Sequence, residues 1–113
     1  MRKLLAPLAL LLASVSPAHA EPYRFSVDGA AGVDAALADF TFASGEKMPE
    51  LTLRYITLGT PQHDAKGDVI NAVMILHGTG GTGKQFFQPQ FADELFGPGQ
   101  PLDTARYYVI LPH

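Results

Sequence analysis

The stretch from Val69 to Lys84 constrains the fold more than any other part of this chain. It begins with a near-continuous apolar run, Val69–Leu76, and continues as His-Gly-Thr-Gly-Gly-Thr-Gly-Lys, with four glycines in six positions. Such an apolar run is typical of a strand buried on both faces, as in a parallel sheet. Because α/β proteins place their chemistry where a buried strand ends in a glycine loop, we predict an α/β fold with a functional loop here.

The residues before this strand predict an antiparallel strand pair. Apolar and polar residues alternate over 39–43 and again over 51–57, which is the period of a half-buried strand. The two runs are close in sequence, so we expect them to pair antiparallel, with Pro49 interrupting strand structure between them. The alanine-rich segment Val33–Phe40 is predicted to form a short helix.

The residues after the loop predict a helix and a further strand. Phe87, Phe91 and Leu95 are spaced by four and would share one helical face, with Pro89 suited to the first turn. Tyr107–Leu111 is a second apolar run. The order strand, loop, helix, strand is a βαβ unit, so the two apolar strands should be parallel.

The N-terminus has the three parts of a secretory signal peptide. Arg2 and Lys3 precede an apolar run over 4–13, and Ala18-His19-Ala20 has the small-x-small pattern of a cleavage site. We therefore predict a signal peptide at 1–20, a partial domain at 21–113, and a periplasmic or secreted protein with no membrane attachment after cleavage. Removing the two basic residues takes the formal net charge from −3 to −5, which argues against a nucleic-acid partner.

The glycine loop is compatible with three kinds of site. Gly78, Gly83 and Lys84 fit a P-loop, but its eighth position is Gln85 instead of the serine or threonine that holds magnesium. Gly78, Gly80 and Gly83 fit a dinucleotide fingerprint, but no carboxylate ends the next strand to hold a ribose. The third interpretation is the oxyanion loop of an acyl-transfer enzyme, which starts from the pair His77-Gly78.

A series of short motifs resembles the homoserine O-acetyltransferase-like branch of the α/β-hydrolase superfamily. They occur in the order that this branch has them, over about 39–113: Ser44-Gly45-Glu46, Pro49-Glu50-Leu51, Leu53-Arg54-Tyr55, Leu58-Gly59-Thr60, Asn71-Ala72-Val73 and His77-Gly78. The resemblance implies the N-terminal part of an α/β-hydrolase sheet, truncated before the nucleophile elbow. It also implies that Thr79 donates a backbone N–H to the oxyanion, within a loop that Gly78 and a structural His77 complete.

The function implied is that of an exported serine hydrolase acting on a small-molecule ester or acyl substrate. The elbow serine, acid and histidine of the triad have no counterpart in these 113 residues, so the chain by itself is expected to be inactive. An acyltransferase of the homoserine O-acetyltransferase type and a non-catalytic exported module or gene remnant are the alternatives. No cofactor is expected, and no metal either, since His63 and Asp64 have no further ligand nearby.

Overall fold

The computed structural model describes residues 21–113, so the predicted signal peptide lies outside the described residues. A four-stranded mixed sheet is the centre of the fold, with the strands in the order β1-β2-β4-β3. The elements follow one another as η1 (Val27–Gly29), β1 (Ala31–Thr41), β2 (Lys47–Leu58), β3 (Ala72–Met74), η2 (Gly83–Phe87), α1 (Pro89–Leu95) and β4 (Tyr108–Pro112). Within this part of the chain, every helix is too short or too polar to cross a membrane.

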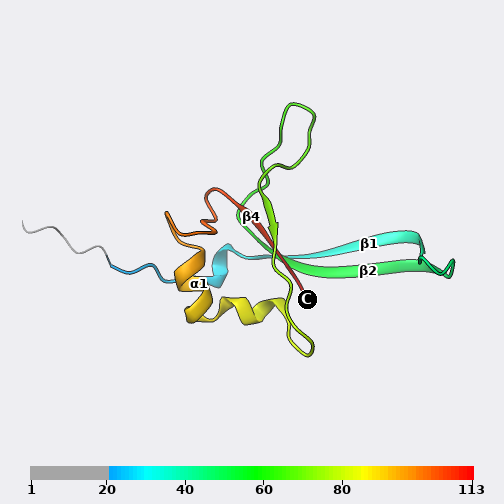
Figure 1. Ribbon diagram of the computed structural model, residues 1–113, viewed down its shortest axis with the longest axis horizontal. Coiled ribbons are helices and arrows are strands. Elements are labelled where there is room, and N and C mark those ends of the chain that lie inside the picture. The colour runs from blue at the N-terminus through cyan, green and yellow to red at the C-terminus, as the bar shows by residue number, and fades with distance from the viewer. Residues whose placement is uncertain (1–20) are drawn as a thin grey trace, which may run out of the picture.

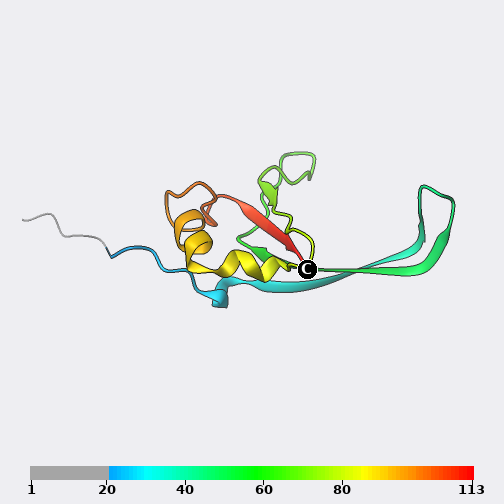
Figure 2. The ribbon, with the colours of Figure 1, turned by 60° about the horizontal axis from the view of Figure 1, so that its bottom comes forward.

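The predicted antiparallel strand pair is confirmed as β1 and β2, which form a long hairpin extending away from the rest of the domain (Figures 1 and 2). The helix predicted over Val33–Phe40 is wrong, because this segment lies in β1. An eight-residue segment is too short to hold a helix by itself, whereas pairing with β2 satisfies its backbone hydrogen bonds. Tertiary pairing therefore overrides the local preference of the alanines.

The predicted interruption at Pro49 is also wrong, since β2 runs through it. The ladder omits only this position: Ala38 pairs with Glu50 and Phe40 with Met48. Asp39, which would face the proline, has a φ of 52°. Pro49 has no N–H to donate, so a local distortion of β1 lets the hairpin continue past it.

The βαβ unit is confirmed, with β3 parallel to β4 and α1 starting at Pro89 between them. The buried strand predicted over Val69–Leu76 is shorter than expected, and its burial on both faces is wrong. Met74 is 59% exposed and Leu76 is 70% exposed. β3 is an edge strand that pairs only with β4, and the described helices leave one of its faces uncovered.

The core lies between the sheet and the helical segments on one of its faces. Leu58 pairs with Val109 in the β2–β4 register, and both side chains point to this face with Leu111. The side chains that cover them come from η2, α1 and the residue that caps α1: Phe86, Ala92 and Phe96. Burying each such side chain stabilises the fold by about 1.5–3 kcal/mol, so this small cluster holds the two helices to the sheet.

Asn71, directly before β3, connects two loops through its side chain. Its Oδ1 accepts from the backbone N–H of Gln62 at 2.8 Å, and its Nδ2 donates to the carbonyls of Thr60 and Arg106, both at 3.0 Å. The side chain is buried, so these three backbone groups depend on it for hydrogen bonding. This one residue therefore positions the start of β3 against the segment that leads into β4.

Candidate functional site

The glycine loop lies where the parallel strands β3 and β4 end. The β3–β4 ladder continues one residue past β3, because Ile75 donates its N–H to the carbonyl of Ile110 at 3.0 Å. At the far end of the loop, Gly83 packs directly on the end of β4. A Cβ there would lie 2.7 Å from the carbonyl oxygen of Pro112, so only glycine fits without displacement. Both ends of the loop are thus attached to the sheet.

The loop closes on itself in a tight turn from Gly78 to Gly81. Gly81 donates its N–H to the carbonyl of Gly78 at 3.0 Å. Gly80 has a φ of 78°, which matches the third position of a type II turn and requires glycine there. The His77 Nδ1 lies 2.8 Å from the same carbonyl and donates to it when that nitrogen carries the proton. When donated, this bond holds the His77 ring against the turn.

Thr79 and Gly80 form the exposed tip of this turn. Among the residues that the structure describes, no acceptor bonds the N–H of either one. The N–H groups at the two central positions of a type II turn do not take part in its closing bond. The structure therefore brings His77, Gly78 and Thr79 together at the carboxyl edge of the sheet, with the backbone donor of Thr79 free to bind an oxygen atom.

Neither serine of the described part of the chain belongs to this loop. Ser26 caps η1 and donates to Asp28 at 2.9 Å, and Ser44 donates to Glu46 at 3.1 Å in the turn of the hairpin. Each hydroxyl has an acidic neighbour instead of a histidine, so neither is set up as a serine nucleophile. Over residues 21–113, no three histidine, aspartate or glutamate side chains are grouped to hold a metal ion.

The carboxylates with shifted pKa values have structural roles. The N–H of Phe25 and the guanidinium of Arg24 lower the pKa of Asp93, which ties the N-terminal segment to α1. The N–H groups of Gly99 and Ala105 lower the pKa of Asp103 in the loop before β4. The lowered pKa values keep the carboxylates of Asp93 and Asp103 ionised and hydrogen-bonded. A general base would need a pKa nearer neutrality.

Comparison with known proteins shows which proteins this arrangement resembles. No family model matches the chain. The homoserine O-acetyltransferase of Natronomonas pharaonis is 37% identical over 86 residues, which cover 67% of this chain and 20% of that protein. The crystal structure of esterase E22 aligns with 72% of this chain and 23% of its own, at a TM-score of 0.54 and 24% identity. The crystal structure of the homoserine O-acetyltransferase from Bacillus anthracis aligns with 74% of this chain and 23% of its own chain, at a TM-score of 0.53 and 24% identity.

The chain has the fold of the N-terminal part of the α/β-hydrolases. Within that superfamily its sequence is homologous to the homoserine O-acetyltransferases, which confirms the resemblance carried by its ordered motifs. The chain spans about a fifth of the length of these relatives.

Proposed function

We propose that this chain is the N-terminal part of an exported serine hydrolase that acts on a small-molecule ester or acyl compound. The observation that carries the proposal is the unbonded N–H of Thr79, at the tip of a turn beside the carboxyl ends of two parallel strands. In acyl transfer, backbone N–H groups stabilise the oxyanion that forms when a serine attacks the acyl carbon. The serine, its histidine and the acid would be supplied by residues outside these 113.

Each residue of the loop then has a distinct part in the chemistry. His77 and the Gly81 N–H both bond the carbonyl of Gly78, which holds the turn in one conformation. Gly80 supplies the positive φ that leaves the preceding N–H at the tip. A donor held in place before the reaction does not have to reorganise as charge develops, and this preorganisation is the source of the rate enhancement.

A second candidate function is acyl transfer to an alcohol acceptor, which the 37% identity to a homoserine O-acetyltransferase favours. Both reactions form the same acyl-serine intermediate and differ in whether water or an alcohol accepts the acyl group. Hydrolysis is preferred for two reasons. The export signal predicted at residues 1–20 would take the protein away from cytoplasmic acyl-CoA, and the loop has His77-Gly78 where the acetyltransferases usually have His-Ala. The likeness to esterase E22 extends to the fold alone.

The test uses this chain joined to downstream residues that carry a G-x-S-x-G elbow, an acid and a histidine. Thr79→Ala keeps the backbone N–H and should change kcat little. Thr79→Pro removes the donor, and the loss of one oxyanion donor lowers kcat by about 10²–10³-fold, or about 3–4 kcal/mol. Circular dichroism and melting curves must show that both variants fold equally well. Equal losses in the two variants would refute the backbone role of Thr79.

Two further measurements separate the alternatives. The joined protein is given p-nitrophenyl acetate in water, and then acetyl-CoA with homoserine. Turnover of the ester without an alcohol acceptor supports a hydrolase, and strict dependence on homoserine supports the acyltransferase. The 113-residue chain alone should hydrolyse no ester above background, because it contains no elbow serine. A non-catalytic module would remain inactive in both forms.

A further inference from the structure

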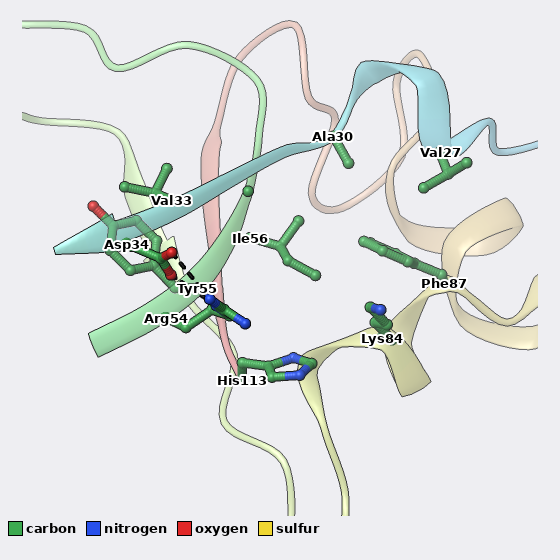
Figure 3. A pocket seen from close by; sticks show the side chains of 11 residues that line it. Val27, Ala30, Val33, Asp34, Arg54, Tyr55, Ile56, Lys84, Phe87 and His113 are labelled. Carbon is green, nitrogen blue, oxygen red and sulfur yellow. Dashed lines mark hydrogen bonds and ion pairs between the residues drawn. The ribbon is translucent and has the colours of Figure 1, made fainter. Parts of the chain in front are cut away.

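A cavity of about 450 Å³ lies on the helical face of the sheet, and neither Thr79 nor Gly80 lines it. Five segments form its walls: η1 with the following Ala30, the strands β1 and β2, the helix η2, and His113 after β4. Figure 3 shows these side chains converging from separate parts of the chain. The volume is within the usual range for small-molecule sites, about 300–1,000 Å³.

One wall of the cavity is apolar. Val27, Ala30, Ile56 and Phe87 line it, as Figure 3 shows. The ring of Phe87 is held in place by stacking on Phe25, with 5.1 Å between the ring centroids. A fixed aromatic ring beside an aliphatic side chain provides a surface on which a hydrocarbon tail loses contact with water.

The rim beside this wall has basic side chains. Arg54, His113 and Lys84 lie in a row along it in Figure 3. Arg54 already bonds Asp34 through two nitrogens, at 2.7 and 3.0 Å, so this pair has little net charge. Asp34 has the only acidic side chain among the residues that line the cavity.

Lys84 is therefore the side chain that determines the sign of the field at the cavity. In the part of the chain that the structure describes, the two ion pairs are Arg24–Asp93 and Arg54–Asp34, so the Lys84 ammonium has no carboxylate partner. Lys84 is exposed, so an anion can reach its ammonium from solvent without displacing a bonded carboxylate. The rim consequently favours a negatively charged group over a neutral one.

We propose that this cavity binds an amphiphilic monocarboxylate, with the carboxylate at Lys84 and the aliphatic tail against Ile56 and Phe87. The apolar wall explains why a tail is needed, and the unpaired ammonium explains why the head is an anion. The proposal does not depend on the oxyanion role of Thr79, because the cavity and the turn tip share no residue.

The experiment titrates the full 113-residue chain, labelled with ¹⁵N and amidated at His113 so that no terminal carboxylate lies at the rim, with sodium hexanoate, and follows backbone amide shifts at Gly32 and Ile56. Sodium acetate has the charge without the tail, and 1-hexanol has the tail without the charge. Hexanoate should bind more tightly than either of them. Equal affinity for hexanol and hexanoate would show an apolar site only and would overturn the proposal, as would equal affinity for acetate.

Two substitutions test the two halves of the site separately. Lys84→Met keeps the length of the side chain and removes the charge, and loss of one bond to a charged group weakens binding by about tenfold. Lys66→Met, in an exposed turn far along the chain from the cavity, is the matched control and should leave the affinity unchanged. Ala30→Leu fills the apolar wall and should prevent hexanoate binding without altering the surface charge.

Each variant is compared with the parent chain by its amide spectrum, so that a folding defect is seen directly. If Lys84→Met does not fold, Ala30→Leu still decides the location of the site. Hexanoate binding that is the same in the parent, in Lys84→Met and in Ala30→Leu would refute the proposal. Shifts confined to residues outside the cavity would refute it as well.

Discussion

The side chain of Asn71 offers a sharp test of how the loops of this domain are held. It satisfies three backbone groups at once: the N–H of Gln62 and the carbonyls of Thr60 and Arg106, at distances of 2.8 to 3.0 Å. Asn71→Ala removes all three bonds and keeps the backbone hydrogen bond from Tyr108 to the Asn71 carbonyl. The change therefore isolates the contribution of one amide side chain.

The expected loss follows from the number and burial of these groups. A buried polar group left without a partner costs about 1–3 kcal/mol. The loops here are near the surface and the smaller side chain admits water, so each group should lose an amount near the lower limit. We expect the free energy of unfolding to fall by about 3 kcal/mol, a large share of the stability of a small domain.

Urea unfolding followed by circular dichroism measures this loss. Gln62→Ala is the matched control: its exposed side chain has no bond in the network and its backbone N–H remains, so it should change stability by less than about 0.5 kcal/mol. Asn71→Asp keeps the acceptor for that N–H but turns a carboxylate oxygen towards two carbonyls, and should lose at least as much at neutral pH. A loss below about 1 kcal/mol for Asn71→Ala would refute the reasoning.

The remaining predictions concern acid stability, packing and export. The Phe25 N–H lowers the pKa of Asp93 in the folded state. The ionised carboxylate therefore stabilises the fold above its unfolded pKa of about 4, and this stabilisation is lost as the pH falls further. In Asp93→Asn, the urea midpoint should change less between pH 6 and pH 2 than it does in the parent chain. Gly83→Ala places a methyl group against the end of β4 and should cost about 1–3 kcal/mol in urea unfolding, whereas Gly78→Ala, with no neighbour within 4 Å of the added carbon, should cost less. Exported protein should begin at Glu21 in N-terminal sequencing, and a start at Met1 would contradict the signal peptide.

Local periodicity predicted the order and pairing of the strands, but not their full length. Alternation over two segments predicted the antiparallel hairpin, and Pro89 marked the start of α1. The single helical face predicted for Phe87, Phe91 and Leu95 is wrong, because Phe87 ends η2 before an extended Gln88 and Phe91 is 42% exposed. The order of strand, helix and strand predicted that β3 and β4 are parallel. These features depend on which residues face the core and on the length of the connections, and both are properties of neighbouring residues.

The predictions that failed depended on partners distant in the sequence. Val33–Phe40 has helical composition, yet it forms a strand because residues 48–55 of β2 pair with it. Val69–Leu76 has the composition of a central strand, yet Met74 and Leu76 are exposed because β3 lies at the edge. The composition of a segment indicates whether its side chains can be buried. Whether other strands or helices cover that segment is determined only by the tertiary fold.

The candidate site also has features that the sequence predicted and features that only the tertiary structure decided. The sequence by itself predicted an oxyanion loop, because the loop starts from His77-Gly78 and the ordered motifs around it resemble the homoserine O-acetyltransferase-like branch; this role stays a prediction. Only the tertiary structure decided that the Gly78–Gly81 turn leaves the Thr79 N–H unbonded, and that Lys84 and His113 line one cavity. The cavity residues come from five separate segments, and no local pattern can reveal them, because the contacts that bring them together form only when the sheet and helices pack.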